Sequence, residues 1–65
     1  MTSDEVRRIR SQLGLTQVEL ADLVGVAPNS VARWERGEMA VRESAARLLV
    51  LLAEQRRRER RRRTR

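Results

Sequence analysis

The sequence predicts an all-α fold of four to five short helices in one small domain. Apolar residues recur three or four positions apart, which is the spacing of a helix face. Gly14, Gly25 and Gly37 each follow such a run, where helices commonly end in a left-handed residue. With 65 residues, the chain has room for a single hydrophobic core.

The first helix is expected over residues 3–13. Thr2 and Glu5 have the spacing of a capping box, in which the side chains at two positions three apart bind each other's backbone N–H groups. Apolar residues then repeat at helical spacing as far as Leu13, and Gly14 ends the run.

The second helix has a stronger start signal. Thr16 and Glu19 form another capping box. Leu15 precedes this cap and Leu20 lies four positions into the helix, which is the spacing of a hydrophobic staple. Gly25 ends the helix after about eight residues.

The third helix is expected to begin at Pro28, because a proline suits the first helical position, where its missing N–H costs nothing. Val31 and Trp34 should face the core, and Gly37 closes the helix. The opposite face is free of core residues and carries Pro28, Asn29, Ala32, Arg33 and Arg36.

The fourth helix should run from Glu43 or Ser44 to at least Gln55. Its centre, residues 48–53, is apolar on every side, whereas a helix that covers one small core needs a single apolar stripe. We interpret residues 43–55 as a dimerisation helix, with monomer core alone as the alternative. The residues expected at a two-fold interface are Leu48, Leu49, Leu51 and Leu52.

Residues 56–65 form an arginine-rich tail outside the expected domain of residues 1–55. The tail holds eight arginines and one glutamate, so the high pI of 11.7 describes the tail rather than the domain. Such a block is commonly solvated and attracts nucleic acid without sequence preference, although it could also continue the fourth helix or only solubilise the chain. The residues concerned are Arg56, Arg57, Arg58, Arg60, Arg61, Arg62, Arg63 and Arg65.

Composition weighs against catalysis, and we expect a protein that is not an enzyme. The chain has no cysteine and no histidine, which removes thiolate and imidazole chemistry and the usual metal ligands. No metal or other cofactor is expected. No apolar run is long enough to span a membrane, and the charged start is not a signal peptide, so the expected location is the bacterial or phage-infected cytoplasm, on the nucleoid.

The two central helices, joined by a tight turn that contains glycine, have the arrangement of a helix-turn-helix. At this point the sequence resembles the Cro and lambdoid-repressor (Xre-type) family, whose domains have the lambda-repressor-like fold. The fourth helix also resembles that of MqsA-type antitoxin DNA-binding domains and of small phage or anti-CRISPR-associated autorepressors. The resemblance covers about residues 4–55 and rests on Leu13-Gly14-Leu15-Thr16-Gln17, Glu19-Leu20-Ala21, Gly25-Val26, Val31 and Arg33-Trp34-Glu35-Arg36-Gly37-Glu38.

The resemblance implies that the third helix enters the major groove of DNA and that two subunits read two half-sites. Its first residues would then read bases. Asn29 suits adenine and Arg33 suits guanine, each through two hydrogen bonds, whereas Pro28 offers only an apolar contact. The expected phosphate contacts are Gln17, Ser30, Arg36, Arg42 and Arg10. The positions that Arg10 and Glu35 match in this family also suggest that the two side chains form a structural ion pair between the first and third helices.

These observations favour a sequence-specific, dimeric transcriptional regulator, most simply an autorepressor of an inverted-repeat operator that acts by occlusion. Two alternatives stay open. The first is an antitoxin or other protein-interaction module with a toxin or other protein as partner. The second is a general nucleic-acid binder driven by the arginine tail.

Overall fold

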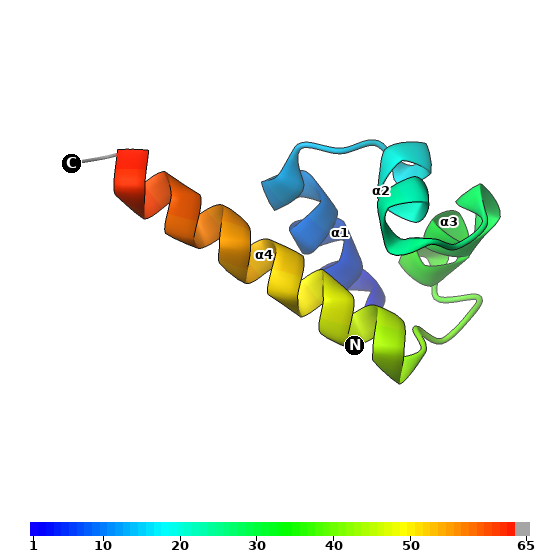
Figure 1. Cartoon of the computed structure of the whole chain (residues 1–65). Helices are drawn as coiled ribbons and strands as arrows, with labels where there is room; N and C mark the ends of the chain where they lie inside the picture. The colour runs from blue at the N-terminus through cyan, green and yellow to red at the C-terminus, as the bar shows by residue number, and fades with distance from the viewer. Residues whose placement is uncertain (64–65) are drawn as a thin grey trace.

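The computed structural model describes residues 1–63 and contains four helices in that range (Figure 1). Helix α1 spans Ser3–Leu13, α2 spans Gln17–Val24, α3 spans Pro28–Arg36 and α4 spans Glu43–Arg63. The all-α prediction is confirmed, and the first three helices have the predicted bounds. Within residues 1–63, none of the helices is long and apolar enough to cross a membrane.

The first three helices form a compact bundle on one side of α4, which is a long rod (Figure 1). Helix α2 packs mainly against α3, and α1 packs against both α3 and α4. Because α4 contacts the bundle only along its first part, its C-terminal end projects beyond the other helices. This projection gives the molecule its length of 41 Å, against 19 Å and 18 Å across.

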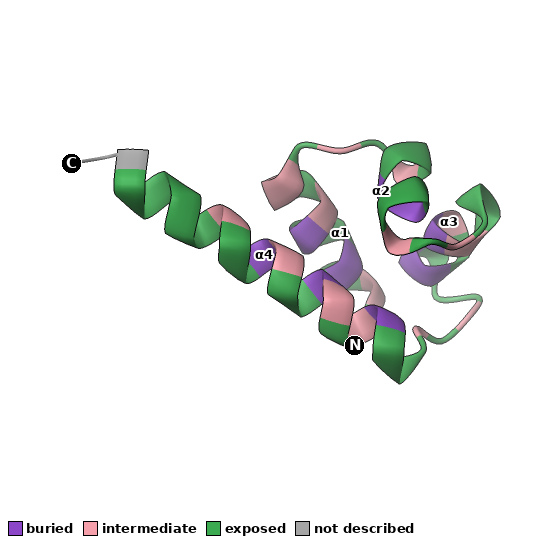
Figure 2. Cartoon of the chain, in the orientation of Figure 1, coloured by how far each residue is buried: buried purple, intermediate pink, exposed green. Residues whose placement is uncertain are grey.

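The core lies where the inner faces of the four helices meet, as the buried segments in Figure 2 show. It is mostly aliphatic, and its one aromatic residue is Trp34. The indole N–H of Trp34 is buried without a hydrogen-bond partner in the described structure. The buried apolar residues are Val6, Ile9, Leu20, Ala21, Val31, Trp34, Ala45, Leu49 and Ala53.

Local sequence signals determine where the short helices begin and end. Both capping boxes are present: the backbone N–H of Glu5 donates to Thr2 Oγ1 at 3.2 Å, and that of Glu19 donates to Thr16 Oγ1 at 3.1 Å. Gly25 follows α2 with a φ of +83°, a backbone region that L side chains rarely adopt. The turn between α2 and α3 therefore depends on glycine at this position.

Helix α4 continues without a break through the boundary expected between residues 55 and 56. The arginine segment is helical as far as Arg63, so continuation of the helix is the alternative that the structure shows. Arg56 and Glu59 are one turn apart and form an ion pair within the segment, with 3.7 Å between Arg56 Nη1 and Glu59 Oε2. Arg65 and the side chain of Arg63, both assigned to the tail, lie outside the described residues.

The structure corrects the expectation for one residue of the dimer interface. Leu49 is completely buried between α4 and the bundle, so it belongs to the core of one chain and cannot reach a second. Leu48 and Leu52 are half-buried, whereas Leu51 is 57% exposed and its neighbour Val50 is 44% exposed. The apolar surface of α4 that remains outside the core is therefore centred on Val50 and Leu51.

Candidate nucleic-acid interface

Helices α2 and α3 form the helix-turn-helix, and their packing presents one face of α3 to solvent. Val31 and Trp34 of α3 are buried against the rest of the bundle. The backbone N–H groups of Gly25 and Val26 both donate to the carbonyl of Ala21, each at 2.9 Å, which closes α2 and starts the turn. Pro28 then opens α3 at its first turn without a side-chain cap.

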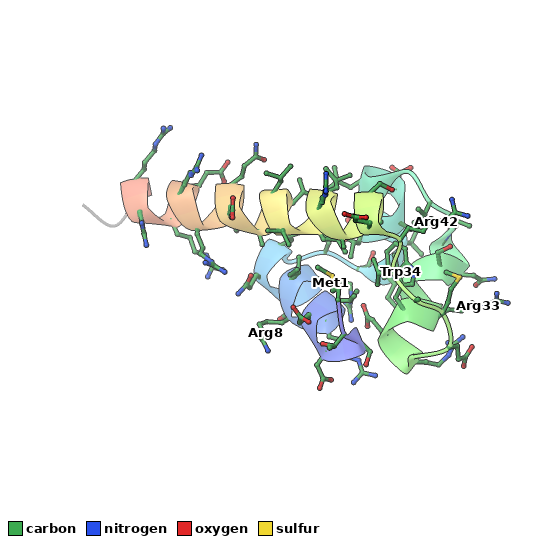
Figure 3. All side chains as sticks on the ribbon, turned by 90° about the horizontal axis from the view of Figure 1, so that it is seen from below. Met1, Arg8, Arg33, Trp34 and Arg42 are labelled. Atoms are coloured by element: carbon green, nitrogen blue, oxygen red, sulfur yellow. The ribbon has the colours of Figure 1, made fainter. Side chains whose placement is uncertain are left out.

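The predicted base-reading residues lie on the exposed face of α3. Pro28, Asn29 and Arg33 are all exposed, and Ser30 is half-buried. Asn29 and Arg33 are four residues apart and therefore share one side of the helix. Figure 3 shows Arg33 and Arg42 at the same end of the molecule, with the Arg33 side chain pointing away from the protein.

Arg36 is already paired in the free protein. Its Nε and Nη2 donate to the two carboxylate oxygens of Glu38 at 2.7 and 3.2 Å, and both side chains are exposed. These hydrogen bonds, with a smaller contribution from the charge of Arg33, hold the pKa of the Glu38 carboxyl below its ordinary value. A phosphate would therefore compete with Glu38 for Arg36. The sequence did not predict this competition.

The carboxylate of Glu35 links three helices beneath this face. Glu35 is 4% exposed, and its oxygens accept from Arg10 of α1, with Nε at 2.5 Å and Nη2 at 3.0 Å. Gln17, the first residue of α2, donates its amide N–H to the same carboxylate at 3.2 Å. The side chain of Gln17 is thus oriented by Glu35 at the N-terminus of α2.

This network corrects the phosphate contact expected for Arg10. Its guanidinium holds Glu35 and also donates to the carbonyl of Leu15 at 3.2 Å, so Nε, Nη1 and Nη2 all have protein acceptors. The ion pair that the family positions suggested is the role that the structure shows. The pairing with Arg10 holds the pKa of Glu35 below its ordinary value, against the opposing effect of burial, and Gln17 lowers it further.

Arg7 is a member of this network that the sequence analysis missed. Its Nη2 donates to the backbone carbonyl of Glu35 at 2.6 Å, near the C-terminus of α3. Arg7 lies three residues before Arg10 and therefore on the same side of α1, which is the signal that could have identified it. Two arginines of α1 thus fix the end of α3 relative to the core.

The arginine segment lies far from α3. Helix α4 starts beside the end that carries α3 and runs away from it, so Arg56 to Arg63 form the opposite end of the molecule (Figure 1). At about 1.5 Å per residue, Arg58 is roughly 20 Å along the helix from Glu43. Within one chain, these arginines and the exposed face of α3 therefore lie at opposite ends of the molecule.

Comparison with known families agrees with this geometry. A model of the helix-turn-helix family matches residues 6–54, which is most of the chain, and the chain belongs to this Cro and lambdoid-repressor-like (Xre-type) family. Comparisons with curated proteins and with solved structures gave no match. The fold, the exposed face of α3 and the family together define a DNA-binding helix-turn-helix regulator.

Proposed function

We propose that the protein is a dimeric, sequence-specific repressor that binds an inverted-repeat operator with α3 in the major groove, acts on the nucleoid in the cytoplasm and controls its own gene. The observation that carries this proposal is the exposed face of α3. Asn29 and Arg33 have no role in the core, yet the helix that holds them is anchored by its buried inner face and by hydrogen bonds to Glu35 near its C-terminus. A polar face on a firmly held helix is what direct reading of base edges requires.

The side chains of this face suit different parts of the DNA. Arg33 reads guanine through two hydrogen bonds, Asn29 reads adenine, and Pro28 makes an apolar contact with a thymine methyl group. The phosphate contacts come from the surrounding surface and fix the position of the helix on the duplex. We assign them to Gln17, Ser30, Arg36 and Arg42.

Repression follows from occupancy of the groove. A dimer that covers two adjacent half-sites excludes other proteins from the same stretch of duplex, including RNA polymerase where the operator overlaps a promoter. The inverted repeat follows from two-fold symmetry, with half-sites about one helical turn apart.

Selection from random duplex DNA at roughly physiological salt tests the proposal, because non-specific binding is weak there. The expected result is enrichment of an inverted repeat. Arg33→Ala should then lower the preference for this repeat over scrambled DNA by about fivefold or more for each half-site, since a two-bond arginine contact gives about 1–3 kcal/mol of discrimination. Arg8→Ala is the matched control, because Arg8 is an exposed arginine of α1. Unchanged discrimination in Arg33→Ala would contradict the assignment.

The exposed arginines at the C-terminal end of α4 favour a second candidate function, that of a general nucleic-acid binder. These residues are Arg57, Arg58, Arg60, Arg61 and Arg62. Deletion of residues 60–65 separates the two. A repressor keeps its preference for the selected repeat and loses affinity for every sequence, with a less steep dependence on salt. A binder driven by the arginines loses nearly all affinity and shows no preference before or after the deletion.

A further inference from the structure

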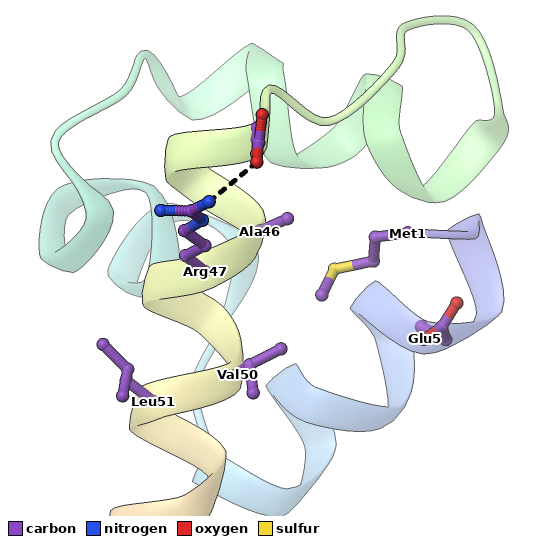
Figure 4. A pocket seen from close by; sticks show the side chains of 7 residues that line it. Met1, Glu5, Ala46, Arg47, Val50 and Leu51 are labelled. Carbon is purple, nitrogen blue, oxygen red and sulfur yellow. Dashed lines mark hydrogen bonds and ion pairs between the residues drawn. The ribbon is translucent and has the colours of Figure 1, made fainter.

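An apolar groove lies between the N-terminus of α1 and the first half of α4. Its volume is about 570 Å³, and Met1, Ala46, Val50 and Leu51 supply its apolar lining (Figure 4). Glu43 and Arg47 border the groove. They form an ion pair along α4, with 2.9 Å between Arg47 Nη2 and Glu43 Oε1. Met1, Val50 and Leu51 are three of the five large apolar side chains that are exposed in the described structure.

The outer face of α4 has a regular order of charge on both sides of this apolar centre. Between Glu43 and Arg58, the exposed residues at helical spacing on this face are Glu43, Arg47, Val50 with Leu51, Glu54 and Arg58, and Arg61 continues the same face one turn further. They lie on the side of the helix opposite Leu49 and Ala53, which face the core. From Glu43 to Arg58 the order is therefore negative, positive, apolar, negative, positive.

This order is complementary to itself only when a second copy runs antiparallel. If Val50 and Leu51 of two copies meet at a two-fold axis, Arg47 lies opposite Glu54 of the second copy, and Glu43 lies opposite its Arg58. Symmetry makes each of these pairs occur twice, which gives four ion pairs around the apolar centre. In a parallel pair each charged residue would face its own copy, and all four positions would repel.

We propose that the outer face of α4 binds a second copy of this chain, with the two helices antiparallel and crossing at Val50 and Leu51. This inference rests on the dimer of the proposed function. It adds the surface through which the two copies pair, the relative direction of their α4 helices and the residues that lie opposite each other. The apolar centre supplies most of the attraction, and the four ion pairs select the direction. The pairing also brings the arginine end of each α4 back beside the first turn of the other, where Glu43 lies.

Cysteine cross-linking tests the direction, because the chain contains no cysteine of its own. Arg47→Cys and Glu54→Cys, both at exposed positions, are mixed in equal amounts and oxidised in a glutathione buffer, and the products are weighed by mass spectrometry. The antiparallel register predicts that the mixed disulfide dominates well beyond the half expected from random pairing. In that register, two copies of the Arg47→Cys variant would hold their new thiols about 10 Å apart, too far for a disulfide.

Other outcomes of the cross-linking would overturn the proposal. A product in which each variant is linked mainly to a copy of itself indicates parallel pairing. Random proportions, such as those expected when Asp22→Cys at an exposed position of α2 replaces Glu54→Cys in the mixture, indicate that this face does not pair. The readout needs no DNA, so a chain that cross-links as expected but selects no operator would contradict the proposed function alone. A monomer that still selects a single half-site would contradict the dimer and its direction.

A charge exchange tests the register independently. Glu43→Arg should weaken dimerisation by about tenfold in sedimentation equilibrium, because two attractive pairs become repulsive. Glu43→Arg combined with Arg58→Glu restores complementarity and should recover most of the affinity. Asp22→Arg changes charge equally at an exposed position of α2 and should leave dimerisation unchanged. Failure of the double variant to recover, with its helix content intact by circular dichroism, would exclude this register.

Discussion

Arg10 and Glu35 form a two-point ion pair between α1 and α3, with Arg10 Nε 2.5 Å from Glu35 Oε2 and Nη2 3.0 Å from Oε1. Gln17 of α2 donates to the same carboxylate, so one buried group fixes the relative positions of three helices. The exposed face of α3 is therefore held from beneath by charge as well as by packing. This arrangement links the stability of the fold to the presentation of Arg33.

Arg10→Ala should lower the free energy of unfolding by about 2 kcal/mol, because it leaves the Glu35 carboxylate buried without its main partner. The expected loss is smaller than for a fully buried pair, since the Arg10 side chain is partly exposed and water can replace part of the interaction. Urea denaturation followed by the fluorescence of Trp34, the one aromatic residue, measures it at fixed chain concentration. Arg8→Ala should change stability by less than about 0.5 kcal/mol.

The stability of the fold should fall in acid partly through Glu35. Hydrogen bonds from Arg10 hold the pKa of Glu35 below its ordinary value of 4.5, so the folded state binds this proton less readily than the unfolded state. The stabilisation is fully present above the unfolded pKa and is lost as pH falls through the lower pKa of the folded state. Urea midpoints measured from pH 7 to pH 3 should therefore decline less steeply in Glu35→Gln. Parallel curves for the two proteins would contradict this.

Glu38→Gln should raise DNA affinity. The carboxylate of Glu38 holds Arg36 in the free protein and places a negative charge beside α3. Its removal frees Arg36 for a phosphate, and affinity for both the selected repeat and scrambled DNA should rise by roughly two- to fivefold at moderate salt. Asp4→Asn, with the same change of charge on α1, serves as the control in a fluorescence-anisotropy titration. Equal behaviour of the two variants would show that Glu38 does not compete with DNA.

Gly25→Ala should destabilise the fold by about 1–2 kcal/mol through the backbone alone. A Cβ at this position would meet no atom within 4 Å, so the cost comes from the φ of +83°. Gly25→Asn should cost less, because asparagine adopts the left-handed region more readily than alanine. If alanine and asparagine destabilise equally in urea denaturation, strain in the turn is not the cause.

The ends of the first three helices were predictable because each has a local signal. Thr2 and Thr16 begin α1 and α2, and a left-handed glycine ends each of the first three helices. Residues 48–53 had no such signal, since they are apolar on every side. Periodicity alone could not show that Leu49 faces the core and that Val50 and Leu51 face outwards, because this depends on how α1 packs against α4.

The site was predictable to the extent that it depends on helix faces. The exposure of Asn29 and Arg33 follows from the positions of Val31 and Trp34 on the same helix. The partners of Arg36 and Gln17 did not follow, because they depend on contacts with Glu38 and Glu35 that spacing does not fix. The conformation of the arginine segment was also open, since helical propensity and repulsion between like charges act against each other.

The order of charge on α4 has a consequence for cells that hold several regulators with this fold. In the proposed dimer, a mixed pair of such proteins would present two unlike α3 faces to DNA and would match the inverted repeat of neither protein. In the antiparallel arrangement, a related chain with the opposite order of charge along its last helix would meet this one with like charges at all four charged positions. If the proposed dimer forms, the charges on the outer face of α4 thus favour antiparallel pairing of this chain with its own copies over antiparallel pairing with such a relative.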